Sequence, residues 1–332
     1  MQPDEFSASP SKPVLSKARG SKARGSKTRK RLALFGIGAG AVWSLFLGFG
    51  LPRLLPELPP PKTAQAPTPQ AQEPEYRTYT LDNATVHVVK LSTDMRPSIA
   101  VADELTTVRD FAQQSGAIAV LNAGFFDPQN GKTTSYLVSA AQVAGDPVEN
   151  ERLVGNPDLE PYMARILNRS EFRVYDCGTN GYQYDIVLHN TTVPTKCAIE
   201  SAVGAGPQLL PEDTSFEEGF TDFENGELTR DAIGSRGANA RSAIALTADN
   251  AVLLIMVAQR PDAPGLTLLE VADFAASIGA TKLLNLDGGS SSSLYYGQTY
   301  LGRLDSEDNP IERPVKSVIL VRPSAGAAID AE

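Results

Sequence analysis

The strongest constraint on this 332-residue chain is a run of 20 residues near its N-terminus that carries no charge. The run extends from Leu32 to Leu51. At about 1.5 Å of rise per residue, a helix of this length spans roughly 30 Å, the hydrocarbon thickness of a bilayer. A cleaved signal peptide is the main alternative, but its apolar core is usually shorter. We therefore predict one retained transmembrane helix at 32–51.

The first 31 residues predict the orientation of that helix. They carry nine lysines and arginines and a tandem Ser-Lys-Ala-Arg-Gly at 16–20 and 21–25, a composition typical of a disordered tail. Basic flanks of a membrane span stay in the cytoplasm, so the bulk of the chain is expected on the exported side, whether periplasmic, lumenal or extracellular. Nucleic-acid binding is a weaker explanation of this charge, because the adjoining apolar run already accounts for it.

Composition divides the rest of the chain into a linker, a domain and a tail. Eight prolines punctuate 52–74, which is expected to form an extended tether. The stretch 75–323 is long enough for one sizeable core, and 324–332 is predicted to be a disordered tail. Of 39 acidic and 30 basic residues, 2 and 9 lie in the first 31, so the remainder has a net charge of −16. This charge argues against nonspecific binding of nucleic acid or anionic lipid.

Hydrophobic periodicity predicts an α+β domain with a mixed, largely antiparallel sheet packed with a few helices. Seven segments have the pattern of strands: Thr80–Leu91, Ser98–Val101, Ser135–Val143, Arg173–Tyr175, Arg241–Thr247, Ala251–Val257 and Val315–Val321. The dipeptide Asp249-Asn250 between two of them predicts a hairpin.

Two helices are predicted, each starting near a threonine. One runs from about 107 to 115 and stops at Gly116. The other begins near Thr267, which forms a capping-box pattern with Glu270, and stops at Gly279.

The two cysteines, Cys177 and Cys197, lie in the part of the chain that is expected to be exported. A disulfide between them is plausible in an oxidising compartment, and two free thiols are the alternative, because the sequence gives no distance. With only two cysteines and two histidines, His87 and His189, a Cys/His zinc cluster is not expected. No metal site and no cofactor are predicted.

The segment most suggestive of chemistry is Leu284-Asn-Leu-Asp-Gly-Gly-Ser-Ser-Ser-Ser-Leu-Tyr-Tyr296. An apolar, strand-like run delivers the carboxylate of Asp287 onto two glycines and four serines. Backbone at Gly288 and Gly289 can be approached closely, and successive N–H groups in such a turn suit an anion. A flexible Gly/Ser linker is the alternative, but the apolar residues on both flanks favour a site.

Two segments of the chain resemble each other. Residues 115–126 align without a gap on 278–289, and in each a helix ends at Gly-Ala, an apolar strand follows, and an asparagine stands near the strand's C-terminal end. Chance similarity of helix-to-strand units is the alternative. Our hypothesis is that the two units are neighbours in one sheet and bring five residues to the same edge: Asn122, Gly124, Asp127, Asn285 and Asp287.

Two arginines that precede strands could bind a phosphate or a carboxylate. Arg241 opens the apolar strand at 241–247, and Arg313 stands just before Pro314 and the last strand. A guanidinium group can hold an oxyanion through two hydrogen bonds. A structural or surface role is the alternative for each.

Five segments in this order resemble the phosphodiester glycosidase family: Asn122-Ala-Gly-Phe-Phe126, Gly204-Ala-Gly-Pro207, Arg241-Ser-Ala-Ile244, Leu286-Asp-Gly-Gly-Ser-Ser291 and Arg313-Pro-Val315. The resemblance covers roughly 80–322. Ser290 stands where members often have a third glycine, Ala245 stands where glycine is frequent, and 149–196 contains no diagnostic motif. These departures leave the preference for sugar and aglycone open.

The resemblance implies hydrolysis of a glycosyl phosphodiester or phosphorylated glycan. Together with the predicted anchor and export, it leads us to expect a membrane-anchored, exported enzyme in envelope or exopolysaccharide metabolism. A phosphate monoester leaves easily, so the leaving side needs charge stabilisation, which is expected from Arg241 and the N–H groups of Gly288 and Gly289. Asp287 would act as nucleophile or base, with Asp127 as a second carboxylate.

The remaining assignments follow from the same resemblance. Asn122 and Asn285 would hold sugar hydroxyls or orient the aspartate. Further substrate contacts are expected from Gly124, Ser290, Ser291 and Arg313. Two other functions remain open: a polysaccharide-binding module that uses the same pocket without turnover, and a serine hydrolase that uses one of the serines at 290–293.

Overall fold

The computed structural model describes residues 73–92 and 95–323. The predicted cytoplasmic tail, the transmembrane helix at 32–51, nearly all of the linker and the C-terminal tail lie outside the described residues. Within 73–92 and 95–323, no helix is long and apolar enough to cross a membrane.

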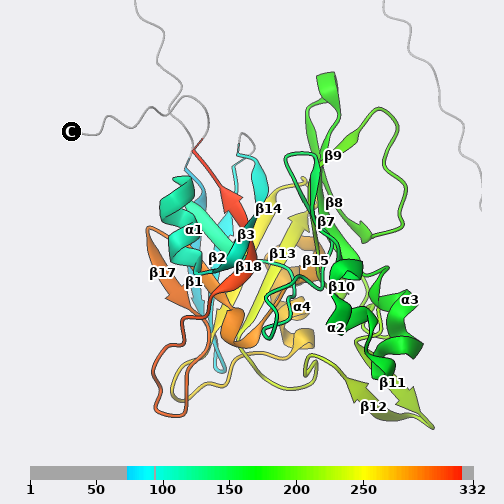
Figure 1. The fold of residues 1–332 in the computed structure, drawn as a ribbon. Coiled ribbons are helices and arrows are strands. Elements are labelled where there is room, and N and C mark those ends of the chain that lie inside the picture. The colour runs from blue at the N-terminus through cyan, green and yellow to red at the C-terminus, as the bar shows by residue number, and fades with distance from the viewer. Residues whose placement is uncertain (1–72, 93–94, 324–332) are drawn as a thin grey trace, which may run out of the picture. The chain divides into compact units, whose positions relative to one another are not determined.

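The described residues form three antiparallel sheets and a separate hairpin (Figure 1). The six-stranded sheet has the order β1 (Glu75–Thr80), β2 (Thr85–Lys90), β14 (Val252–Ala258), β13 (Arg241–Thr247), β15 (Ala280–Asn285) and β10 (Gln208–Leu210). A five-stranded sheet has the order β17 (Gln298–Leu301), β16 (Ser293–Tyr296), β4 (Ala119–Asn122), β18 (Val315–Val321) and β3 (Pro97–Thr106).

The third sheet also has five strands, in the order β6 (Gln142–Gly145), β5 (Leu137–Ser139), β9 (Ala198–Gly204), β7 (Ser170–Asp176) and β8 (Tyr182–Leu188). The separate hairpin pairs β11 (Thr221–Glu224) with β12 (Glu227–Asp231). Short helices α2 (Glu151–Val154) and α3 (Met163–Ile166) connect β6 to β7 together with the 3-10 turns η1 (Pro147–Glu149) and η2 (Pro157–Tyr162). Two further 3-10 turns are η3 (Gly178–Asn180) and η4 (Gly289–Ser291).

The two longer helices begin and end as their sequences predict. Helix α1 (Val108–Ser115) has Thr107 as its N-cap and ends at Gly116, which has a left-handed conformation. Helix α4 (Leu268–Ser277) starts at the full capping box formed by Thr267 and Glu270. Capping satisfies backbone N–H groups that the first turn of a helix would otherwise leave without partners.

Alternation along the strands divides the core into three clusters. In β13, Ile244 points into the central cluster, whereas Ala243 and Ala245 point to the cluster beneath α4. In β4, Leu121 likewise points into the central cluster and Val120 points toward α1. Because successive side chains of a strand face opposite sides, the six-stranded sheet and the β4 sheet share one core, and each has a helix on its outer face.

The predicted α+β class with largely antiparallel sheets is confirmed, and the strands at 241–247 and 315–321 have the predicted bounds. The hairpin at Asp249-Asn250 is also confirmed, because β13 pairs with β14. The single strands predicted at 80–91 and 135–143 are wrong, since a turn interrupts each of them. In the segment 135–143, the turn is formed by Ala140 and Ala141, which adopt positive φ values. Alanine is not a residue from which a positive φ is predicted.

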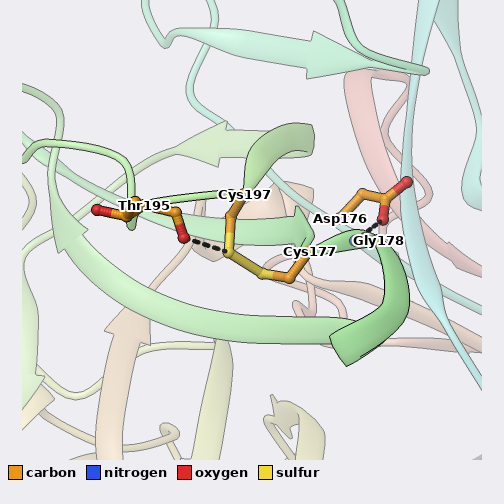
Figure 2. Close-up of a disulfide and its surroundings, with 5 residues drawn as sticks. All are labelled: Asp176, Cys177, Gly178, Thr195 and Cys197. Carbon is orange, nitrogen blue, oxygen red and sulfur yellow. Dashed lines mark hydrogen bonds between the residues drawn. A yellow bond between two sulfur atoms is a disulfide. The ribbon is translucent and has the colours of Figure 1, made fainter.

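The cysteines, for which the sequence leaves pairing and free thiols open, form a disulfide (Figure 2). Cys177 follows the last residue of β7, and Cys197 precedes the first residue of β9. These two strands pair with each other, and their partners Asp176 and Ala198 adjoin the cysteines. The disulfide therefore closes the excursion between β7 and β9, which includes β8.

Candidate active site

The main chain of Asp287 is held where the two helix-covered sheets meet. Asp287 follows the end of β15 in the six-stranded sheet. Its N–H donates to the carbonyl of Ala123 at 2.9 Å, and its own carbonyl accepts from Asn122 Nδ2 at 2.6 Å. Asn122 is the last residue of β4 in the other sheet. Both hydrogen-bonding groups of Asp287's backbone are thus fixed from the opposite sheet.

The amide of Asn122 is completely buried and reaches two further strands. Its Oδ1 accepts from Ser242 Oγ in β13 at 2.6 Å and from the N–H of Ser293 in β16 at 3.1 Å. An unpaired buried amide costs several kcal/mol, so these partners strongly favour one arrangement of the sheets. Of the two roles that the resemblance implies for Asn122, this geometry favours orienting the aspartate, since a buried side chain is not accessible to a sugar.

The hypothesis that the two similar helix-to-strand units are neighbours in one sheet is wrong. Strand β4 lies in a five-stranded sheet and β15 in the six-stranded sheet. Each unit packs its helix, α1 or α4, on the outer face of its own sheet. The strand ends nevertheless meet, because the inner faces of the two sheets share the central core. The predicted convergence of Asn122 with Asp287 therefore occurs between sheets.

Asn285 fastens the segment that follows β9 to the same junction. Its Nδ2 donates to the carbonyl of Gly206 at 2.9 Å, and its backbone N–H donates to Pro207 at 3.0 Å. Gly206 has a φ of +111°, and a β-carbon there would lie 2.3 Å from Glu218 Oε2, so glycine is required. Asn285 is buried and therefore supports the turn, while its Oδ1 has no protein partner.

The segment after β4 carries two of the predicted site residues, Gly124 and Asp127. Gly124 is close-packed, since a β-carbon there would lie 3.1 Å from the carbonyl oxygen of Gly204. Asp127 lies in the following turn, where its carboxylate forms an ion pair with Arg152 at 2.6 Å. Among the described residues no hydrogen bond links Asp127 to Asp287. The geometry thus places Gly124 in a packing role and Asp127 in a surface ion pair.

The carboxyl of Asp287 has an environment that disfavours its charge. The residue is only partly exposed, and burial raises its pKa from 3.8 to about 6. The hydroxyl of Ser291, the charge of Arg313 and the N–H of Gly288 oppose this rise. Ser291 Oγ acts by proximity, because it makes no hydrogen bond of normal geometry. A carboxyl group with this pKa changes charge close to neutral pH, as acid–base and nucleophilic groups often do.

The two glycines after Asp287 differ in what their N–H groups can do. The N–H of Gly288 lies at the Asp287 carboxyl, where it lowers the pKa. The N–H of Gly289 donates to the carbonyl of Ala240 at 2.8 Å. Neither group is therefore free to bind an anion, unlike the concavity that the sequence suggests. Gly289 has a φ of +61°, which lets the chain turn here without a side chain.

Arg313 supplies the positive charge beside this turn. Its Nη1 donates to Ser290 Oγ at 2.9 Å, and its guanidinium lies 5.1 Å from the centroid of the Phe126 ring. Within the described residues this is the single hydrogen bond of the Arg313 side chain. The guanidinium is partly exposed. Four of its five N–H groups are therefore available to a ligand.

Arg303 and Asn239 also lie at this turn, and the sequence does not single them out. A β-carbon built on Gly289 would lie 3.9 Å from Arg303 Nη1 and 3.7 Å from Asn239 Nδ2. Arg303 donates to Asn239 Oδ1 at 2.7 Å, which leaves donors of both side chains without a protein acceptor in the described parts of the chain. Asn239 stands two residues before Arg241, a weak signal, and Arg303 has none.

Arg241 is occupied by the protein itself. It is buried, and burial lowers its pKa. Its guanidinium donates to four main-chain carbonyls, those of Ile233, Gly234, Gly237 and Leu266, at 2.6 to 3.2 Å. The geometry favours a supporting role in which Arg241 shapes the loop that leads to Asn239, in place of the phosphate contact that the sequence suggests.

The four serines after Gly289 also differ in exposure. Ser290 is partly exposed and accepts from Arg313. Ser291, Ser292 and Ser293 are buried, and their hydroxyls have no protein partner. Most buried polar side chains in proteins are hydrogen-bonded, so three such hydroxyls in succession behind a carboxyl group are unusual.

Neither histidine lies at this turn. His87 Nδ1 is 2.7 Å from the hydroxyl of Tyr76, and burial lowers the pKa of His87 to about 4. His189 Nδ1 is 3.1 Å from a carboxylate oxygen of Glu171. Among the residues of 73–92 and 95–323, no three His, Cys, Asp or Glu side chains are arranged to hold a metal ion.

Comparisons with known proteins agree with this picture. The sequence model of the family described as phosphodiester glycosidase matches residues 115–322. The catalytic domain of zebrafish N-acetylglucosamine-1-phosphodiester alpha-N-acetylglucosaminidase, auto-inhibited by its pro-peptide, is 14% identical with a TM-score of 0.54 and covers 77% of this chain and 85% of its own. No curated protein matches the sequence.

Two other solved structures share the fold. A hypothetical protein from Synechocystis is 17% identical with a TM-score of 0.50, and the match covers 75% of this chain and 61% of that one. A putative exported protein from Burkholderia pseudomallei is 15% identical with a TM-score of 0.51, and the match covers 72% and 74%. This chain thus spans about three-fifths of the length of the Synechocystis protein.

The turn at Asp287 thus combines a carboxyl group whose pKa is raised to about 6 with an arginine that keeps donors free, as a hydrolase acting on an anionic substrate would need. The family match covers more than half of the chain. The chain belongs to the phosphodiester glycosidase family, a family of hydrolases acting on phosphodiester-linked sugars, and the resemblance found in its sequence is confirmed.

The raised pKa of Asp287 predicts that the wild-type carboxylate costs stability. Between about pH 4 and pH 6 the folded state keeps a proton that the unfolded state loses, so stability falls as pH rises through this window. Asp287→Asn should therefore be more stable than wild type by about 1–3 kcal/mol at pH 8. Denaturant unfolding at pH 8 and again below pH 4 measures this difference in stability, which should be smaller at the acidic pH. Equal or lower stability of the variant at pH 8 would show that the fold needs the charge.

Proposed function

We propose that the turn at Asp287 hydrolyses a sugar-1-phosphodiester, releasing a free sugar and a phosphate monoester. One observation carries the proposal: Arg313, with four uncommitted N–H donors, contacts the same short turn that presents Asp287. A carboxylate for the anomeric carbon and a cation for the departing phosphate thus lie side by side. The zebrafish relative's name makes N-acetylglucosamine the first sugar to test.

The ionised carboxylate of Asp287 performs the proposed chemistry. Either it attacks the anomeric carbon directly, or it takes a proton from a water that attacks. In both routes the bond from the anomeric carbon to the phosphate oxygen breaks, and the phosphate leaves with the electron pair. A covalent sugar intermediate in the first route is then hydrolysed by water. Both routes require Asp287 to be deprotonated, which its pKa of about 6 permits at neutral pH.

Arg313 and Arg303 are proposed to hold the phosphate. Charge develops on the phosphate oxygens as the bond breaks, and guanidinium groups already in place stabilise it without reorganisation. Arg313 contacts Ser290, and Arg303 lies at Gly289, so the two arginines approach adjacent residues of the turn. Arg241 contributes indirectly, through the loop that positions Asn239.

The serine-hydrolase alternative has weaker support. Ser291, Ser292 and Ser293 are buried, and neither histidine contacts a serine of this run. Ser290 accepts a hydrogen bond from an arginine, which does not activate a hydroxyl as a nucleophile. A binding module without turnover remains the second candidate, since the same donors would hold a phosphorylated glycan.

We also propose that the domain works outside the cytoplasm, tethered by the helix predicted at 32–51 and the proline-rich 52–74, in envelope or exopolysaccharide metabolism. The disulfide between Cys177 and Cys197 supports an oxidising compartment, because disulfides rarely persist in the cytosol.

The decisive test of the activity uses a methyl phosphodiester of N-acetylglucosamine 1-phosphate. Wild type should release the free sugar, with kcat/KM rising about tenfold per pH unit up to a plateau above about pH 6. Asp287→Asn should lower kcat by about 10³-fold or more. Ser290→Ala should retain activity to within about tenfold, whereas a serine hydrolase would lose it. Binding by wild type without any turnover would support the binding module instead.

A matched pair of arginine variants separates phosphate binding from support of the loop. Arg313→Lys should keep the unfolding free energy but lower kcat/KM by about 10–100-fold, because an ammonium group cannot reproduce the guanidinium fork. Arg241→Lys should cost about 2–4 kcal/mol, because several buried carbonyls lose their donor. An Arg241→Lys protein with normal stability and weakened diester binding would restore the role that the sequence suggests.

Fractionation of cells that express the full chain tests the proposed location. The protein should sediment with membranes, and protease added from the exported side should degrade the domain while sparing the basic tail. Recovery of the intact chain in the soluble cytosolic fraction, with both cysteines reduced, would refute the anchor and the export together.

A further inference from the structure

Two arginines, one just before β7 and one in β12, are anchored in the same way. Arg169 Nε donates to the carbonyl of Glu218 at 3.1 Å, and Arg230 Nε donates to the carbonyl of Gly219 at 3.0 Å. Because the two carbonyls belong to consecutive residues, one short turn orients both guanidinium groups. Arg169 and Arg230 are called the hairpin arginines below.

An aromatic ring also supports each of the hairpin arginines. Cζ of Arg169 lies 3.7 Å from the centroid of the Phe220 ring, and Cζ of Arg230 lies 4.3 Å from that of Tyr162. Cation–π contacts of this kind hold a guanidinium group in place without using its N–H groups. Both arginines are partly exposed. Their positions are therefore fixed while a ligand can still reach them.

Most N–H donors of the hairpin arginines remain free. Within the described residues, the bond from Nε is the single hydrogen bond of each side chain, and neither side chain forms an ion pair. Arginine has five N–H groups, so four remain on each. Burial lowers the pKa of Arg169 to about 10, against the charge of Glu218 and together with that of Arg230, so it stays charged at neutral pH. Two neighbouring cations with free donors are arranged to bind an oxyanion.

Two carboxylates of this region are committed to other partners. Glu218 is fully buried, and its side chain accepts from the N–H groups of Ser170 and Gln208 at 2.9 and 3.0 Å. Asp222 pairs with a third arginine, Arg165, at 3.5 Å. Neither carboxylate therefore occupies the free donors of the hairpin arginines.

The ring of Phe220 links the hairpin arginines to the segments around Asp287. Its centroid lies 5.8 Å from that of Phe125, a partly exposed ring in the segment that follows β4. Phe220 also packs against Gly206, where a β-carbon would lie 2.8 Å from Phe220 Cε2. The carbonyl of Gly206 accepts from Asn285, two residues before Asp287. The hairpin arginines thus lie one aromatic ring beyond the segments that hold the proposed catalytic turn.

The proposed ligands of the cleaved phosphate, Arg303 and Arg313, belong to another part of the domain. Figure 1 shows their loop, between β17 and β18, on the left, whereas α3, β11 and β12 lie on the right. With the cleaved phosphate at this loop, the sugar would lie at Asp287. A group on the far side of the sugar would then extend past Phe125 toward the hairpin arginines.

The likeness of the two arginine pairs indicates what that group is. In each pair both guanidinium groups are partly exposed and keep free donors. A phosphodiester has two non-bridging oxygens, and each can accept from a guanidinium fork. A chain in which every sugar is joined to the next through its 1-phosphate carries such a group on both sides of each internal sugar. One kind of polymer thus supplies a ligand to both pairs.

We infer that Arg169 and Arg230 bind a second phosphodiester, carried by the sugar whose anomeric bond is cleaved, and that the substrate is a chain of sugars joined by 1-phosphodiester linkages. The inference rests on the proposed function and names the substrate class on the sugar side of the cleaved bond. It makes the hairpin arginines determinants of specificity, separate from the chemistry at Asp287.

Derivatives of the methyl diester of N-acetylglucosamine 1-phosphate test the inference. One set carries a second methyl phosphodiester on the 3-, 4- or 6-hydroxyl of the sugar, and the matching set carries a methyl ether there. Wild type should cleave at least one phosphorylated isomer with a KM at least about tenfold below that of the matching ether. This ratio of KM values is the preference to follow in variants.

Arg230→Gln should reduce that preference to within about threefold of unity, because the charge and the guanidinium fork are both lost. Arg230→Lys keeps the charge without the fork and should also lose most of the preference. The matched control is Arg236→Gln, which removes an exposed arginine that lies over another ring of the hairpin, Phe223, at 5.7 Å. This control should keep the wild-type preference. Denaturant unfolding establishes that each variant is folded.

Each result has a distinct meaning. Loss of the preference in Arg230→Gln but not in Arg236→Gln supports the inference. Three results overturn it: no preference of wild type for any phosphorylated isomer, a preference that Arg230→Gln retains, or an equal loss in the control. Turnover of the parent methyl diester leaves the proposed function standing in those cases. If wild type cleaves neither the parent nor any derivative, the proposed function fails and the inference with it.

Discussion

The hydrogen bond from the buried amide of Asn122 to the carbonyl of Asp287 is the interaction on which the rest of the site depends. It joins the end of β4 to the end of β15, and its remaining acceptor joins β13 and β16 to the same point. Leaving a buried amide without hydrogen-bond partners costs free energy. These bonds therefore hold the two sheets that share a core in one fixed arrangement. The turn that presents the carboxyl group is a consequence of that arrangement.

The surroundings of Asp287 show why a stable fold retains an unfavourable charge. Burial raises the pKa of the carboxyl to about 6, and only part of this cost is offset by Ser291, Arg313 and the N–H of Gly288. Arg241 and Arg313 differ in how many of their donors the protein itself uses. Arg241 is committed to four main-chain carbonyls, whereas Arg313 keeps most of its donors free. Two arginines that look equivalent in the sequence thus differ: Arg241 holds a loop, and Arg313 keeps donors free.

Local patterns were sufficient wherever the cause of structure is local. The caps of α1 and α4, the hairpin at Asp249-Asn250 and the strand at 241–247 all follow from neighbouring residues. The strand predicted at 80–91 failed because alternation does not show where a chain turns back on itself. The convergence of Asn122 with Asp287 was anticipated, but the sheet to which each belongs was not, since pairing partners far apart in sequence are chosen by packing.

By itself the sequence determined the family, the α+β class, the carboxyl group at 287 and the glycines around it. Short motifs can be recognised in a sequence because turns with positive φ or close packing require glycine. The tertiary structure alone decided which side chains are buried and which donors remain free. In it Arg241, Asn122 and Asp127 make contacts with the protein itself, and Arg303 and Asn239 lie at the turn. Exposure and hydrogen-bond partners depend on segments brought together from across the whole domain, and no single segment encodes them.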